Sequence, residues 1–248
     1  YASVVCFLIT ALFECFIKLS RQTRDFKGNI LSMVKDDFSD SIRFITKERP
    51  DIMKTLLLTA FSRFFVMGVT LVGLPFLVRT VLGLDAKFYG GAESALAVAT
   101  IMGSIAAGLL TGKLRSGRLS YVLVAIGVCI IPAGVVFLFP SGALIRYAVI
   151  VAGFCGMQAA ISIFSIFAVS MIQQNTPDGL IGKIMAYTAA VTMCAQPVGQ
   201  MVYGFLFDRF QGKVYLVLIP SGIVVCVIGL LATGFFRKLE KKQGGAID

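Results

Sequence analysis

Long apolar runs separated by short polar segments make up most of the chain. The run from Lys54 to Arg79 carries a basic residue at each end and is apolar almost throughout. The hydrocarbon core of a membrane is about 30 Å thick, so a helix needs about 20 residues to cross it. This run is therefore predicted to span a membrane. Further runs of spanning length lie at 93–110, 119–139, 147–172, 184–207 and 214–236.

The residues before Lys54 follow two other patterns. Residues 2–17 are apolar and are followed by Lys18, which predicts the end of a spanning helix. Between Arg21 and Lys54 the chain is polar, but apolar side chains recur every three or four positions, as in an amphipathic helix at a membrane surface. That stripe consists of Phe26, Ile30, Val34, Phe38, Ile42 and Ile45.

Lysine and arginine are unevenly distributed among the polar segments. Most of them lie before Lys54, in the loop at 112–118, at Lys183 and in the C-terminal tail. The other segments hold only Arg79, Lys87, Arg146, Arg209 and Lys213. Because positively charged loops stay in the cytoplasm, the first group is predicted to be cytoplasmic. The same distribution explains the net charge of +10 without a nucleic-acid partner.

These patterns predict an all-α, polytopic membrane protein embedded in a lipid bilayer. The composition agrees, since 57% of the residues are hydrophobic and 15% are charged, against about a quarter charged in soluble domains. The chain begins inside an apolar run without Met, so we expect it to be part of a longer protein. The expected parts are a helix end at 1–18, a cytoplasmic amphipathic linker at 19–53, a six-helix bundle at 54–236 and a cytoplasmic tail at 237–248.

The sequence lacks the residue patterns of common enzymes and metal sites. It contains no His, and its six Cys are isolated within apolar runs, with no CxxC pair. It contains neither the phosphate-binding pattern GxxxxGK[ST] nor HExxH, and no span holds paired Asp or Glu residues. We therefore expect no cofactor, no bound metal and no catalytic residue.

One charge stands in the middle of a predicted span. Arg63 lies between Lys54 and Arg79, and its guanidinium stays protonated at ordinary pH. A charge near the bilayer centre costs from about 3 to more than about 10 kcal/mol, depending on the reference state. Arg63 is therefore expected to face a cavity, a substrate or a charged partner. The alternative is that its side chain extends to the cytoplasmic surface.

Other polar and small residues interrupt the apolar runs. Gln158 and Ser162 lie one turn apart, so they either hydrogen-bond a neighbouring helix or line a polar cavity. Gln196 and Gln200 lie in the second half of their span. Small residues that recur along one span are expected to let helix backbones approach closely. These are Gly103, Gly108 and Gly112.

Three motifs, in this order along the chain, resemble the major facilitator superfamily of transporters, and most closely its macrolide-efflux-type permeases. The first is the segment from Asp37 to Leu58, DFSDSIRFITKERPDIMKTLLL, which is similar to the family's amphipathic run into its seventh helix. The second is similar to the loop between helices ten and eleven and consists of Gln173, Pro177, Gly182 and Lys183. The third is similar to a Pro-x-Gly…Gly-x-x-x-Asp-Arg segment and consists of Pro197, Gly199, Gly204, Asp208 and Arg209.

The resemblance covers essentially the whole chain and implies the C-terminal six-helix bundle of that fold, after the end of its sixth helix. It implies two inverted three-helix repeats, at 54–140 and 144–236, with the first helix of each lining a central cavity. A missing N-terminal half of the same protein would complete that cavity. The residues implied along the path of a small-molecule substrate are Arg63, Phe64, Gln158, Ser162, Gln196 and Gln200.

The resemblance also implies a function and a place. The function is ion-gradient-driven export of a small amphipathic compound, such as a macrolide-like drug, by alternating access across a bacterial cytoplasmic membrane. Glu14 and Glu93 are the candidates for ion coupling, although Glu14 is also explained as an interfacial acid beside Lys18. The alternatives are a lipid or lysolipid flippase, an uptake permease, a membrane-embedded enzyme, or a receptor that transports nothing.

The loop GKLRSGR resembles the glycine-rich basic loop that joins the family's second and third, and eighth and ninth, helices. It lacks the family's usual acidic residue, so a loop that only fixes topology is an equal alternative to a gating role. The candidate gating residues are Gly112, Lys113, Arg115 and Arg118 here, with Asp208 and Arg209 in the third motif.

Overall fold

The structure is a computed structural model that describes residues 9–10, 12–13, 44–111 and 116–244. The chain divides into two compact units, Tyr1–Asp40 and Ser41–Asp248. In the first unit, residues 9–10 and 12–13 are helical. Most of the predicted helix end at 1–18, and of the linker at 19–53, lies outside the described residues.

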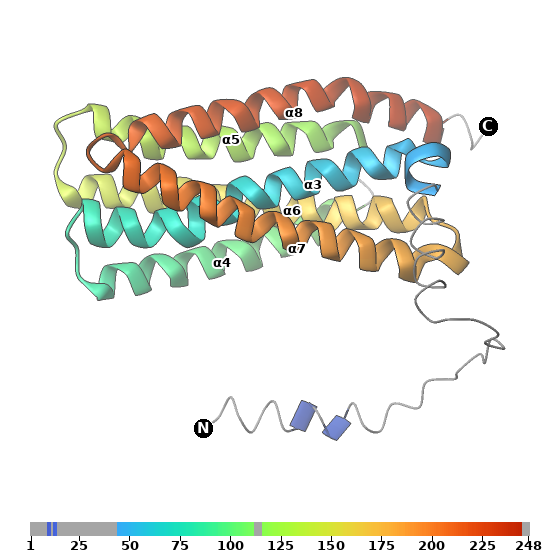
Figure 1. The fold of residues 1–248 in the computed structure, drawn as a ribbon, viewed down its shortest axis with the longest axis horizontal. Helices are drawn as coiled ribbons and strands as arrows, with labels where there is room; N and C mark the ends of the chain where they lie inside the picture. The colour runs from blue at the N-terminus through green and yellow to red at the C-terminus, as the bar shows by residue number, and fades with distance from the viewer. Residues whose placement is uncertain (1–8, 11, 14–43, 112–115, 245–248) are drawn as a thin grey trace. The chain divides into compact units, whose positions relative to one another are not determined.

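The second unit is a bundle of long helices, and its described regular structure is entirely helical (Figure 1). The helix α3 continues into π-helical turns at Val69–Gly73 and Phe76–Val81, so the helical path runs from Pro50 to Val81. The long helices are α3 (Pro50–Gly68), α4 (Ala86–Leu110), α5 (Leu119–Val135), α6 (Ala143–Gln174), α7 (Asp178–Arg209) and α8 (Tyr215–Gly244).

Five stretches of the described chain are long and apolar enough to cross a membrane. They are Pro50–Val81, Ala86–Leu110, Leu119–Leu138, Ala143–Gln174 and Tyr215–Arg237. The helix α7 covers the sixth predicted span, 184–207, but it is not among the five, because Gln196 and Gln200 lower the hydropathy of its apolar segment. The chain therefore has the helices of a multi-pass membrane protein.

Several helices begin earlier than the apolar pattern predicts. The helix α3 begins at Pro50 rather than Lys54, because proline is favourable in the first helical turn, where its missing N–H has no helical partner. The helix α4 begins at Ala86 rather than Glu93, so Glu93 lies about two turns inside it. There Glu93 accepts a hydrogen bond from the Tyr89 hydroxyl, at 3.1 Å.

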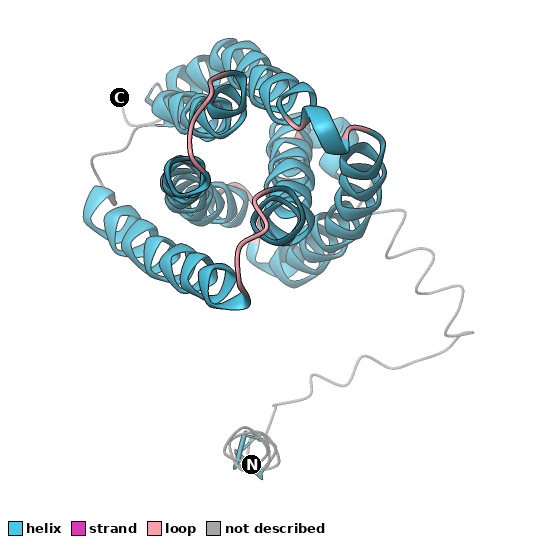
Figure 2. Cartoon of the chain, turned by 90° about the vertical axis from the view of Figure 1, so that its left-hand side faces the viewer, coloured by secondary structure: helices cyan, strands magenta, loops and turns pink. Residues whose placement is uncertain are grey.

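In Figure 1, α5 and α8 lie along one side of the bundle, α4 and α7 along the other, and α3 and α6 between them. This order agrees with the contacts, which are most extensive for α5 with α8 and α6, α3 with α7, and α4 with α6. Figure 2 views the same helices from the end that carries the loops after α3, α5 and α7. The largest fully buried side chains of α6 and α7 form the core between these layers: Phe154, Phe164, Tyr203 and Phe207.

Glycines bring α5 and α8 into close contact at positions that repeat along the chain. A Cβ on Gly127 would lie 2.5 Å from the carbonyl oxygen of Gly222, which is 95 positions later (222 minus 127). Gly134 and Gly229 are separated by the same 95 positions (229 minus 134), and each packs on the opposite helix. Their partners repeat at this spacing too: Leu218 and Ile219 for Gly134, and Leu123 and Val124 for Gly229.

The pairs α3–α7 and α4–α6 also meet through a glycine. Gly199 of α7 packs against the backbone of Phe64 in α3. Gly103 of α4 packs against the backbone of Ala159 in α6, where a Cβ would lie 2.5 Å from the carbonyl oxygen. Phe64 and Ala159 are again 95 positions apart (159 minus 64). The glycines themselves, Gly103 and Gly199, are 96 positions apart (199 minus 103), so the contacts of α3, α4 and α5 correspond to those of α6, α7 and α8 to within one position.

Gly103 and Gly108 were both expected at a helix contact, and the structure confirms only Gly103. A Cβ on Gly108 would meet nothing within 4 Å. Five residues turn an α-helix by roughly 140° beyond a full turn, so Gly108 faces away from α6. Gly112 lies outside the described residues.

Candidate functional site

Arg63 lies about midway along the helical path from Pro50 to Val81. Its side chain is half-buried, and it makes no hydrogen bond or ion pair with a residue of 44–111 or 116–244. The preceding Ser62 is buried and donates a hydrogen bond to the Leu58 carbonyl, at 2.8 Å. The guanidinium is therefore a charge at membrane depth that the described bundle leaves without an acceptor.

Gln158 occupies the corresponding place on α6. Arg63 directly precedes Phe64, and Gln158 directly precedes Ala159, so each adjoins one of the two close backbone contacts. Gln158 is half-buried, and its side-chain oxygen Oε1 is buried with no hydrogen-bond partner among the described residues. Leaving such an acceptor unpaired costs about 1–3 kcal/mol, which a donor from a ligand or water would offset.

The hydroxyl of Ser162, unlike Gln158 Oε1, has a hydrogen-bond partner. It donates to the backbone carbonyl of Gln158, at 3.0 Å, within the same helix. Hydrogen bonds from Ser to the preceding turn are common in helices and do not mark a site. Ser162 is thus half-buried near Gln158, but its donor is already used.

The glutamines of α7 lie at the level of Arg63 along the bundle. Gly199, which touches the backbone of Phe64, lies between Gln196 and Gln200. Both glutamine side chains are half-buried, and neither forms a hydrogen bond with a described residue. The contact of α7 with α3 therefore brings several predicted pathway residues to one depth.

Phe64 belongs to an aromatic cluster at this contact. Its ring centroid lies 5.1 Å from that of Phe65 and 6.2 Å from that of Tyr203. Tyr203 is buried, and its hydroxyl donates to Ser221 Oγ at 2.6 Å, which fixes the ring against α8. Sequence reasoning did not identify Tyr203 or Ser221, because nothing in the apolar pattern pairs residues from different helices.

The loop candidates do not form one site. Arg118 directly precedes α5 and is exposed at one end of the bundle, while Asp208 and Arg209 are exposed at the end of α7, at the opposite end (Figure 1). Of the other candidates for gating and ion coupling, Glu93 lies within α4. Glu14, Gly112, Lys113 and Arg115 lie outside the described residues.

Two hollows open on the bundle away from Arg63. One, of about 310 Å³, lies between α3 and α8 and is apolar apart from Lys54. The other, of about 450 Å³, lies at the end of the bundle where Arg146 faces the Phe137 ring, with its Cζ atom 5.4 Å from the ring centroid. Among the described residues, no three His, Cys, Asp or Glu side chains gather as a metal site would require.

Comparison of the chain with protein-family models, with curated proteins and with solved structures finds no match.

Proposed function

We propose that the chain is the C-terminal six-helix half of a secondary transporter of the major facilitator type. It exports a small amphipathic compound, such as a macrolide-like drug, across a bacterial cytoplasmic membrane by alternating access. The observation that carries this proposal is Arg63, a permanent charge that is half-buried midway along a spanning helix and has no partner among the described residues. Intramembrane charges of this kind are typical of substrate and ion pathways.

The repeated contacts support the transporter architecture. A spacing of 95 positions relates the glycine contacts of α5 and α8, and a spacing of 95 or 96 positions relates the contact of α7 with α3 to that of α4 with α6. Two consecutive units of three helices enter the membrane from opposite sides, which makes the repeat an inverted one, as in many transporters. Arg63 and Gln158 then stand at equivalent positions in the first helix of each unit.

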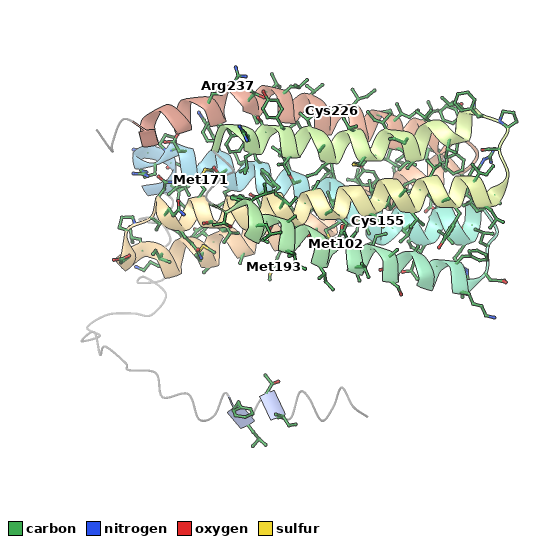
Figure 3. The ribbon with its side chains drawn as sticks, turned by 180° about the vertical axis from the view of Figure 1, so that it is seen from behind. Met102, Cys155, Met171, Met193, Cys226 and Arg237 are labelled. Atoms are coloured by element: carbon green, nitrogen blue, oxygen red, sulfur yellow. The ribbon has the colours of Figure 1, made fainter. Side chains whose placement is uncertain are left out.

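The exposed faces of α4 and α7 support a second half as the partner. Met102 of α4 and Met193 of α7 lie along one edge of the bundle, away from α5 and α8 (Figure 3), and are 64% and 72% exposed. Because α4 and α7 are equivalent helices of the proposed repeat, a second six-helix half would meet them as a pair. That half would supply the other wall of the pathway and an acidic partner for Arg63.

An ion gradient is the proposed energy source. Glu93 is half-buried in α4 and bonded to the Tyr89 hydroxyl, so it is the one described candidate for ion coupling from the sequence. Glu14 and carboxylates of the second half are the other candidates. The small-molecule substrate would enter between the halves, beside Arg63, Phe64 and Gln158.

Accumulation of test compounds in cells that express the protein from its complete gene tests this proposal. The compounds are a macrolide, a cationic dye and a labelled lysophospholipid, each measured with and without a protonophore. We expect lower macrolide or dye levels that recover when the gradient is collapsed. Unchanged drug levels together with gene-dependent movement of the lysophospholipid would contradict export of drugs and favour a flippase.

A further inference from the structure

The groove between α3 and α8 opens sideways between two membrane-spanning helices. Its walls are formed by Leu57 and Phe61 on α3 and by Ile228 and Leu231 on α8, and it holds about 310 Å³. These walls are also open to the surroundings, since Phe61 is 50% and Leu231 is 75% exposed. A volume of this size is at the lower end of the range for small-molecule sites, about 300–1,000 Å³.

The helix pairs α5–α6 and α3–α8 correspond to each other at the spacing of 95 positions. The groove lies in the α3–α8 pair, where bulky residues stand at the positions that are glycines in the α5–α6 pair. Gly153 and Gly156 let α6 close on α5, where their Cβ atoms would lie 2.5 Å and 2.8 Å from atoms of Cys129. The residues 95 positions earlier are Leu58 and Phe61 of α3, and both line the groove. Accordingly, α8 packs along α3 far less extensively than α5 packs along α6. The opening is thus built into the sequence of α3.

Lys54 is the one charged residue among those lining this apolar groove, and it lies at one end of it. Lys54 is exposed, and its Nζ lies 5.2 Å from the centroid of the Phe235 ring on α8. It forms no hydrogen bond or ion pair with a residue of 44–111 or 116–244. The acid Asp51, one helical turn before Lys54, lines a separate small cavity against Met171 of α6. The ammonium group therefore keeps donors free for an anion.

The dimensions match one leaflet of a bilayer. Lys54 and Phe61 are seven residues apart, so the groove reaches about 10 Å from the charge into the hydrocarbon. Half of the hydrocarbon core is about 15 Å thick. Arg237 lies two residues after Phe235 and is exposed, but it does not line the groove and donates a hydrogen bond to the Tyr121 hydroxyl of α5, at 3.3 Å. With Lys54 at the level of the headgroups, the apolar walls would lie beside the acyl chains of one leaflet.

We propose that the α3–α8 groove binds an acyl chain of an anionic glycerophospholipid, and that Lys54 holds the lipid's phosphate. The site would retain a resident lipid and does not depend on what the protein transports. The charge complementarity favours this occupant over a zwitterionic lipid, because a cation near the membrane surface selects anionic headgroups.

The absence of Trp from the sequence allows a direct test. A Leu231→Trp variant carries the only tryptophan of residues 1–248 at the rim of the groove, and any tryptophan encoded outside these residues is replaced by Phe. The fluorescence of the variant is measured in bilayers that contain brominated lipids. Brominated phosphatidylglycerol and brominated phosphatidylcholine serve as anionic and zwitterionic quenchers. Leu230→Trp is the matched control, since Leu230 is 60% exposed at the same depth on α8 but does not line the groove.

For Leu231→Trp we expect brominated phosphatidylglycerol to give half-maximal quenching at a concentration about fivefold lower than brominated phosphatidylcholine does. This is the preference for an anionic lipid that one cation near the membrane surface provides. Adding Lys54→Gln should remove this preference, whereas Lys54→Arg should keep it, which separates the charge from any folding defect. Leu230→Trp should show no preference. Equal quenching of Leu231→Trp by both lipids, or a preference that survives Lys54→Gln, would overturn the proposal. So would a lack of quenching at Leu231→Trp when Leu230→Trp is quenched, because protein would then fill the groove.

Discussion

At the scale of single residues, the bundle leaves two polar groups unpaired at equivalent positions. Arg63 has no acceptor among the described residues, and Gln158 Oε1 is buried without a donor. Native proteins rarely keep such groups without a compensating function, since each lowers stability. The sequence alone identified Arg63, because a permanent charge inside an apolar run is visible by inspection. It left Gln158 undecided, because only coordinates show whether a buried amide has found a partner.

Replacing Arg63 by Ala should reduce efflux to the background level while the protein still inserts, because in the proposed transporter this charge contacts the substrate or an acidic group of a second half. Arg63→Lys should also be impaired if a carboxylate is bound through two nitrogens, which a single ammonium cannot match. Efflux rates are measured against the amount of protein in the membrane. Arg79→Ala is the control, since Arg79 is exposed near the end of the same helical path. Normal efflux by Arg63→Ala would exclude a role in transport.

Replacing Gln158 by Leu should leave stability unchanged or raise it by up to about 1–3 kcal/mol, because it removes an unpaired buried acceptor. We expect transport to fall at the same time if the amide contacts the substrate. Thermal unfolding of the purified protein and efflux in cells are the two measurements. Ser162→Ala, which loses one hydrogen bond within its own helix, is the control and should lower the Tm only slightly. A larger loss of Tm for Gln158→Leu would indicate a structural role for Gln158.

At the scale of helices, the apolar pattern predicted the existence of each long helix but not how the helices meet. Length and hydropathy were sufficient for α3, α4, α5, α6 and α8, because a bilayer requires a minimum apolar run. The starts of α3 and α4 were predicted too late, because a helix continues through polar residues beyond the apolar segment. The pairing of Tyr203 with Ser221, and the groove beside α8, depend on helix rotation, which the pattern does not determine.

Replacing Gly103 by Ala, which adds one methyl group, should destabilise the packing of α4 on α6. A Cβ there would lie 2.5 Å from the carbonyl oxygen of Ala159, so the backbones must separate. Overpacking of this kind costs about 1–3 kcal/mol, and each kcal/mol lowers the Tm by about 2–4 °C in a chain of this size.

Gly108→Ala on the same helix is the matched control, because its Cβ would meet nothing within 4 Å. Thermal unfolding in detergent should therefore give a lower Tm for Gly103→Ala than for the unmodified protein. The Tm of Gly108→Ala should be unchanged. Similar Tm values for both variants would show that the close contact of α4 with α6 is absent in solution.

At the scale of the whole molecule, the two ends of the bundle differ in their number of basic residues. The loops after α3, α5 and α7 lie at one end, while α3 begins and α8 finishes at the other (Figures 1 and 2). Among the described residues, the end with these three loops has few basic residues, and the opposite end carries Arg118, Lys183 and Arg237. Since positively charged loops remain in the cytoplasm, the end with more basic residues is predicted to be the cytoplasmic one. Successive helices cross in opposite directions, so this also predicts the orientation of each helix.

Cysteine labelling in intact cells should reveal this orientation. Gly142→Cys and Gly212→Cys, in loops at the end with few basic residues, are expected to react with a membrane-impermeant maleimide from outside. Gly179→Cys, at the opposite end, should react only after the membrane is opened. All three glycines have nothing within 4 Å of an added Cβ, so the substitutions are sterically free, and a background without the native cysteines removes competing thiols. The reverse pattern would place the C-terminus outside the cell and would turn the proposed exporter, with its lipid site, to the opposite leaflet.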